Sequence, residues 1–184
     1  MVLNMVYCFL ADGFEEVEAI APIDMLKRAS VSVTTVGVGK KVITGSHKIP
    51  VTCDITTDGL SLTDELQAVI LPGGMPGTLN LDADETVHAA IDFAVKNNKL
   101  VCAICAAPSI LGKKGLLSGK EAIAFPGFEK ELKGAAISKK SVVKDGIFIT
   151  AKGAGVAVDF GLEIVAAIEG REKSDEIKAQ IQCK

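Results

Sequence analysis

The 184-residue sequence contains no tryptophan, one tyrosine and seven phenylalanines, so few large rings are available to fill a core. Valine, isoleucine, leucine and alanine must fill it instead, which is typical of sheets buried on both faces. Hydrophobic residues make up 48% of the chain and charged residues 23%, the balance of a globular protein. The length predicts a single domain over residues 1–184.

The sequence also lacks an excess of basic residues and a long apolar run. Its net charge is −3 and its lysines and arginines are scattered, so we expect no nucleic-acid partner. The apolar start, Met1 to Leu10, is too short for a signal peptide with its cleavage site, and far too short to cross a membrane. We therefore expect a cytoplasmic protein that does not bind membranes.

Cysteines are few and irregularly spaced, and this pattern argues against a disulfide framework. The five positions are 8, 53, 102, 105 and 183. An odd number without regular spacing predicts reduced thiols in a reducing compartment. Neither His47 nor His88 has a cysteine pair at ligand spacing, so we predict no metal site.

Short apolar runs alternate with helical patterns along the chain. We predict strands over Leu3–Leu10, Val31–Val38, Ala68–Leu71, Leu100–Ile104, Glu121–Phe125, Ser141–Val143 and Ile147–Thr150, with a hairpin in 41–55. We predict helices over Glu15–Ala29, Glu85–Asn97, Ala106–Lys113, Val156–Ile168 and Lys173–Ile181. This alternation predicts an α/β fold with a mainly parallel sheet and helices on both faces. A ligand would bind beyond the carboxyl ends of its strands.

Cys105 is the strongest candidate for chemistry. A buried strand ends in Ile104-Cys105-Ala106 and a helix follows with no loop between, which is the pattern of a nucleophile elbow. Amide groups at a helix N-terminus favour an anion, so this context predicts a lowered thiol pKa. The alternative is that Cys105 is a small buried hydrophobic residue, as cysteine often is.

Cys102 and Cys105 together form a C-x-x-C pair. A redox dithiol of that type places both cysteines in the first turn of a helix. Here Cys102 lies within the predicted strand, where residues three apart point to opposite faces. The pattern therefore argues against a working disulfide.

Two other segments fall at predicted strand ends or helix starts. Gly73 and Gly74 follow a strand, where glycines let backbone N–H groups approach a ligand, so with Ala106 they could form an oxyanion hole. Glu15 and Glu16 are interpreted as helix capping and a solvated face. Glu18 lies one turn further in, and burial near Cys105 would raise its pKa and let it carry a proton.

The chain resembles the ThiJ/PfpI superfamily, in the branch of DJ-1 and its bacterial ThiJ-like relatives. Four segments occur in family order over essentially the whole chain: 11–18, 71–74, 103–108 and 153–162. The resemblance implies a flavodoxin-like sandwich, a homodimer, and no metal or organic cofactor. It assigns the oxidisable nucleophile to Cys105, the protonated carboxyl beside it to Glu18, and the backbone donors to Gly73, Gly74 and Ala106.

This sequence departs from the family pattern at three places. The protease-like branch has a histidine where this chain has Ala106, so a Cys-His peptidase pair is not available there. Animal members have a histidine near the thiol where this chain has Phe125, which leaves Glu18 as the proton carrier. Gly153-Ala154-Gly155 replaces Gly-Pro-Gly, a change expected to affect loop rigidity; these glycines and Phe125 are predicted to form the pocket rim.

His47 lies in the hairpin where relatives have an arginine that reaches the partner subunit's site. It could do the same here or be an ordinary surface histidine. His88 is predicted to be a surface residue of its helix.

The resemblance implies enzymatic handling of reactive carbonyls: glutathione-independent conversion of 2-oxoaldehydes to hydroxy acids, or deglycation of glycated protein or nucleotide. The alternative is a redox sensor or chaperone that acts through oxidation of Cys105. Amidase or peptidase activity is disfavoured by Ala106. Nothing in these residues supports a role in thiamine synthesis.

Overall fold

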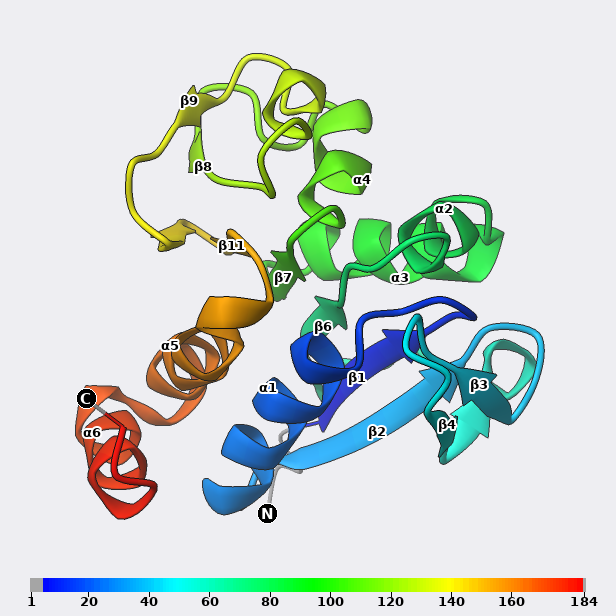
Figure 1. The fold of residues 1–184 in the computed structure, drawn as a ribbon, viewed down its shortest axis with the longest axis horizontal. Helices are drawn as coiled ribbons and strands as arrows, with labels where there is room; N and C mark the ends of the chain where they lie inside the picture. The colour runs from blue at the N-terminus through cyan, green and yellow to red at the C-terminus, as the bar shows by residue number, and fades with distance from the viewer. Residues whose placement is uncertain (1–4, 184) are drawn as a thin grey trace.

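The computed structural model describes residues 5–183, and a seven-stranded sheet forms its centre (Figure 1). The strands lie in the order β10-β11-β7-β6-β1-β2-β5, and all are parallel except β10, which runs antiparallel to β11. Their bounds are β1 Met5–Leu10, β2 Ser32–Gly37, β5 Ile55–Thr56, β6 Leu66–Leu71, β7 Leu100–Ile104, β10 Val142–Asp145 and β11 Phe148–Ala151.

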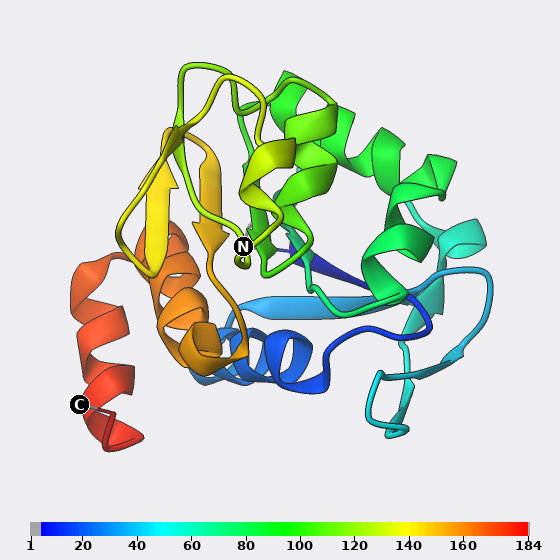
Figure 2. The same ribbon diagram turned by 45° about the horizontal axis from the view of Figure 1, so that its top comes forward.

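Helices cover both faces of this sheet, as predicted. Their bounds are α1 Glu16–Arg28, α2 Gly77–Asp82, α3 Glu85–Lys96, α4 Pro108–Lys113, α5 Ala157–Glu169 and α6 Arg171–Gln180. Helices α1 and α5 pack against each other on one face, and α6 lies outside α5 (Figure 2). Helices α2, α3 and α4 contribute to the core on the other face. The fold is therefore a doubly wound, flavodoxin-like sandwich.

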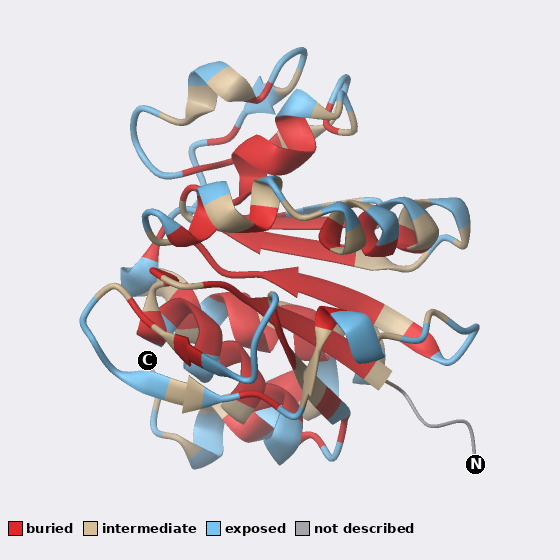
Figure 3. Cartoon of the chain, turned by 90° about the vertical axis from the view of Figure 1, so that its right-hand side faces the viewer, coloured by how far each residue is buried: buried red, intermediate tan, exposed pale blue. Residues whose placement is uncertain are grey.

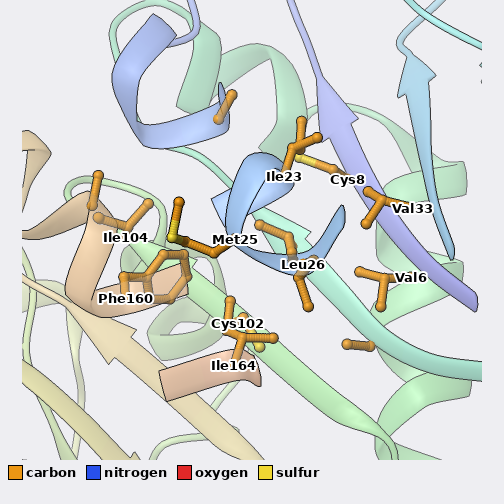
Figure 4. Packing of buried hydrophobic residues seen from close by; sticks show 14 of the residues in the cluster. Val6, Cys8, Ile23, Met25, Leu26, Val33, Cys102, Ile104, Phe160 and Ile164 are labelled. Carbon is orange, nitrogen blue, oxygen red and sulfur yellow. The ribbon is translucent and has the colours of Figure 1, made fainter. Parts of the chain in front are cut away.

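The two faces enclose separate hydrophobic cores, and the strands between them are buried (Figure 3). Under α1 and α5, Leu26 and Phe160 pack with Cys102 and Ile104 of the sheet (Figure 4). Aliphatic side chains dominate both cores, as the shortage of aromatic residues predicts. Burial on both faces explains why the strand sequences are continuous apolar runs and do not alternate between apolar and polar residues.

Two small sheets lie outside the central one. The predicted hairpin in 41–55 is present as β3 (Val42–Thr44) paired antiparallel with β4 (Pro50–Thr52). The predicted strand Glu121–Phe125 is confirmed only as β8 (Glu121–Ala122), paired with β9 (Ala136–Ile137). Three short 3₁₀ turns complete the described elements: η1 (Thr57–Gly59), η2 (Glu129–Glu131) and η3 (Ala154–Val156).

Strand register places the candidate residues together. Leu71 of β6 pairs with Ala103 of β7, and Ala151 of β11 pairs with Ile104, so the three strands end at nearly one level. The segments that follow these ends carry Gly73, Cys105 and Gly153. Residues 3 and 4 of the predicted first strand lie outside the described residues. Within the described part, no helix is long and apolar enough to cross a membrane.

Candidate active site

The backbone at Cys105 is held in a left-handed conformation, with a φ of 64°. This conformation is uncommon for a residue with a side chain, and it costs roughly 1 kcal/mol or more. Two hydrogen bonds fix it: the Cys105 N–H donates to the Ala151 carbonyl over 2.9 Å, and the Phe125 N–H donates to the Cys105 carbonyl over 2.8 Å. The structure thus confirms the sharp turn of a nucleophile elbow.

Glu18 reaches this turn from the first turn of α1. Glu15 is the N-cap of that helix, and its Oε2 accepts a hydrogen bond from the Glu18 N–H over 2.8 Å. The capping role predicted for Glu15 is therefore confirmed. The Glu18 side chain is buried, with 1% of its surface exposed, and its carboxyl group is hydrogen-bonded to the Cys105 thiol.

Gly73 and Gly74 connect the helix to the elbow. The Gly73 N–H donates to Glu18 Oε2 over 2.9 Å, while the Gly73 carbonyl accepts from the Glu15 N–H over 2.9 Å. A Cβ atom on Gly73 would lie 2.6 Å from the Cβ of Cys105 and 2.6 Å from Glu18 Oε2. Only glycine leaves room for the cysteine and the glutamate to meet here.

The sulfur of Cys105 has backbone donors of its own. The N–H groups of Gly74 and Ala106 hydrogen-bond to it, whereas the N–H of Gly73 is engaged by Glu18. Among the three predicted donors, Gly74 and Ala106 therefore face the sulfur. The Ala154 N–H is a further donor to the Glu18 carboxyl, which the sequence pattern did not reveal.

Burial changes the acid–base properties of both groups. It raises the pKa of Glu18 to about 7, with a further increase from the charge of Glu15, although hydrogen bonds from Cys105, Gly73 and Ala154 favour the charged form. Burial and the Glu18 carboxylate together raise the pKa of the Cys105 thiol to about 12, against the opposing effect of the Ala106 and Gly74 N–H groups.

The prediction of a lowered thiol pKa is therefore wrong for Cys105 beside an ionised Glu18. The predicted helix start at Ala106 is also two residues too early: α4 begins at Pro108 and has six residues, so its dipole is small. The two groups nevertheless act as one unit. The pair loses its first proton near pH 7 and holds the second until about pH 12, so one proton is shared in between.

The other core thiols differ in surroundings. Cys8, Cys53 and Cys102 are free and at least 98% buried, and burial raises the pKa of each thiol, that of Cys53 to about 11. Cys102 lies inside the core under α1 and α5, as Figure 4 shows. These are inert core positions.

Glu16 is not on a solvated helix face, contrary to prediction. It is buried, and its Oε1 accepts a hydrogen bond from the His47 N–H over 2.8 Å while Oε2 lies 2.9 Å from His47 Nδ1. His47 is exposed, and Glu16 raises its pKa. One ligand atom from each of Glu15, Glu16 and His47 lies within 4.8 Å of the other two, a spacing that could hold a cation. Hydrogen bonds to the β3–β4 loop already account for the Glu16 oxygens.

The remaining predicted residues are Phe125, the glycines of the segment 153–155 and His88. Phe125 is 46% exposed, and its ring is the side chain nearest to Gly153. Gly155 faces open space. His88 is a partly exposed residue of α3, as predicted, and its Nε2 lies 2.7 Å from the Asp82 carbonyl oxygen.

A doubly wound sheet with a cysteine elbow and a facing buried glutamate defines a class of small α/β proteins. The DJ-1/PfpI family matches residues 4–167 of this sequence. The chain belongs to the DJ-1/PfpI family.

Individual relatives resemble the chain over most of its length. The protein dj-1beta of Drosophila melanogaster is 34% identical over 171 residues, which is 91% of each chain. A Pyrococcus abyssi protein named a deglycase is 32% identical over 148 residues, or 77% of this chain and 86% of that one. The crystal structure of a cysteine-to-alanine mutant of a DJ-1 superfamily protein from Salmonella typhimurium superposes with a TM-score of 0.90 at 33% identity, covering 97% and 98% of the two chains.

Proposed function

We propose that this protein is a cysteine-dependent enzyme that converts 2-oxoaldehydes to 2-hydroxy acids without glutathione. The observation that carries the proposal is the hydrogen-bonded pair of Cys105 and Glu18, which supplies a nucleophile and a proton carrier in one buried place. Membership of a family with a deglycase-named member supports carbonyl chemistry of this kind, including action on glycated substrates.

The reaction begins when ionised Glu18 accepts the thiol proton of Cys105. The sulfur adds to the aldehyde carbon of methylglyoxal, and Glu18 passes the thiol proton to the aldehyde oxygen, which gives a hemithioacetal and leaves Glu18 ionised. Glu18 then removes the hydrogen of that carbon and returns it as a proton to the neighbouring carbon, while the hydroxyl proton of the hemithioacetal moves to the former ketone oxygen. The product of this transfer is a thioester of lactate. Water hydrolyses the thioester and releases lactate and the free thiol.

The backbone N–H groups of Gly74 and Ala106 support the oxygen that gains charge during addition. Both already donate to the sulfur, so both lie within reach of an oxygen on the carbon bonded to it. Their contribution does not depend on protonation, because backbone amides do not titrate in this range.

Lactate formation from methylglyoxal tests the proposal directly. The wild-type protein should produce lactate, and Cys105→Ser should abolish production, while Cys183→Ala retains it as a control for the loss of one thiol. Lactate formation that survives in Cys105→Ser, or that is absent from the wild type, would refute the enzymatic role.

A second role is supported by the same donors. Gly74, Ala106 and protonated Glu18 can hydrogen-bond a sulfenate or sulfinate on Cys105, which suits a sensor of peroxide. In this role one equivalent of peroxide should oxidise Cys105 ahead of the other thiols, as read by peptide mass spectrometry. Oxidation spread evenly over all five cysteines would argue against it.

A homodimer is the proposed assembly. One exposed side of α1 and the β3–β4 hairpin carries apolar side chains, of which Val17, Ile20 and Ile49 are 51%, 45% and 55% exposed. Burial of such side chains against a second copy would be favourable. Light scattering should give the mass of a dimer for the wild type and of a monomer for Ile20→Asp; a monomeric wild type would contradict the assembly.

A further inference from the structure

A cavity of about 350 Å³ lies between the turn 125–126 and the segment 152–156. Both of its walls are attached to the catalytic pair. On one side the Phe125 N–H donates to the Cys105 carbonyl over 2.8 Å; on the other the Ala154 N–H donates to the Glu18 carboxyl. Each wall is therefore fixed by a hydrogen bond to one member of the pair, while the cavity itself is lined by the segments 125–126 and 152–156.

The walls are apolar. Phe125 presents nearly half of its surface, and Pro126 and Val156 add further carbon atoms. Gly153 has no side chain that would fill the space: a Cβ there would lie 3.3 Å from Phe125 Cδ2. Lys152 supplies the cavity's one charged side chain, and its exposure leaves the ammonium group free to stay in water.

We propose that this cavity is a subsite for a flat apolar substituent, so that the preferred substrates are 2-oxoaldehydes with an aromatic tail. This inference rests on the proposed function and extends it to a substrate class. The aldehyde carbon adds to Cys105, the aldehyde oxygen faces the Gly74 and Ala106 donors, and the ring packs on Phe125. Stacking against Phe125 and the exclusion of water by Pro126 and Val156 favour the aromatic substrate.

Comparison of two substrates tests the subsite by turnover. The kcat/KM for phenylglyoxal should exceed that for methylglyoxal by tenfold or more in the wild type. Phe125→Ala should lower this ratio at least fivefold, mainly through a higher KM for phenylglyoxal, and Phe125→Leu should keep most of it. The control Ile137→Ala removes an equally exposed apolar side chain from β9 and should leave the ratio unchanged. An unchanged ratio in Phe125→Ala would overturn the subsite.

Alkylation of Cys105 tests the same subsite without turnover. Phenacyl bromide and iodoacetamide both transfer a carbon to the thiol with loss of halide, but only the first carries a ring. Each alkylation rate of Cys105 is divided by the rate of the same reagent with glutathione. This relative rate should be at least fivefold higher for phenacyl bromide than for iodoacetamide, and Phe125→Ala should lose this preference. A preference kept without any aldehyde turnover would support the subsite and refute the enzymatic role. Aldehyde turnover without an aromatic preference, in kcat/KM or in alkylation, would support the enzymatic role and refute the subsite.

A second copy of this chain is the competing occupant of the cavity. If these walls form an interface, Phe125→Ala would shift the mass of the protein toward the monomer by light scattering and leave both preferences unchanged. That combination would overturn the subsite.

Discussion

The carboxyl group of Glu18 on α1 is hydrogen-bonded to the thiol of Cys105 at the end of β7, although the two residues are 87 positions apart in the sequence. Both groups are withdrawn from water, which raises the pKa of each. The consequence is a pair that carries one shared proton above neutral pH, the form in which the thiol has a base beside it.

Protein stability should report the buried carboxyl. Folded Glu18 binds a proton up to about pH 7, whereas the unfolded side chain releases it near its ordinary pKa of 4.5. The folded state therefore binds more protons between pH 4.5 and 7, so its stability falls as the pH rises through that window, by about 3 kcal/mol at most. Glu18→Gln should remove this decline. Urea unfolding of both proteins at pH 4.5, 6 and 8 measures it; parallel stability curves would show that Glu18 is not buried in a neutral form.

Gly73→Ala should inactivate the protein. Its added methyl group would displace the cysteine or the glutamate, and misplacement of a reacting group by an ångström costs about 100-fold in rate. Gly59→Ala adds the same atom in η1, where the nearest atom outside the adjoining residues, Ile55 Cβ, lies 4.0 Å away, so its lactate formation should stay within about twofold of the wild type. Equal rates in the two variants would contradict the geometry around Gly73.

Glu16→Ala should loosen the β3–β4 hairpin. The substitution leaves the N–H groups of His47 and Ile49 without their acceptor, and this should lower the free energy of unfolding by about 2 kcal/mol. The pKa of His47, which Glu16 raises, should fall back toward 6.5. NMR titration of the two histidines measures this, with His88 on α3 as the reference signal. A His47 titration that is the same in both proteins would show that the ion pair is absent in solution.

Local patterns predicted much of this structure because the information lies within each segment. The apolar run Leu100–Ile104 followed at once by small residues predicted the elbow at Cys105, and the turn at Gly73 and Gly74 marked the end of β6. The resemblance to relatives, rather than any local pattern, paired Glu18 with Cys105. Burial of the carboxyl then depends on how α1 packs against the ends of β6 and β7.

Features that depend on distant segments were missed. From the sequence, Glu16 was predicted to be a solvated helix residue, because its partners Ser46 and His47 lie 30 and 31 positions away in a hairpin. The short α2 was not predicted, since its polar residues and flanking proline resemble a loop. The raised thiol pKa also follows from tertiary structure, because burial and a carboxylate from another element together outweigh two backbone donors.

The pH dependence of Cys105 alkylation by iodoacetamide, followed by mass spectrometry in the wild type and in Glu18→Gln, tests the pair most directly. Because the thiol reacts when one proton is left on the pair, the wild-type rate should rise with a midpoint near pH 7. Glu18→Gln removes the base, so the rate at pH 7 should fall and the midpoint should move toward that of a buried, isolated thiol, above about 8.5. Identical profiles with a midpoint above 8.5 in both proteins would contradict an activated nucleophile at Cys105.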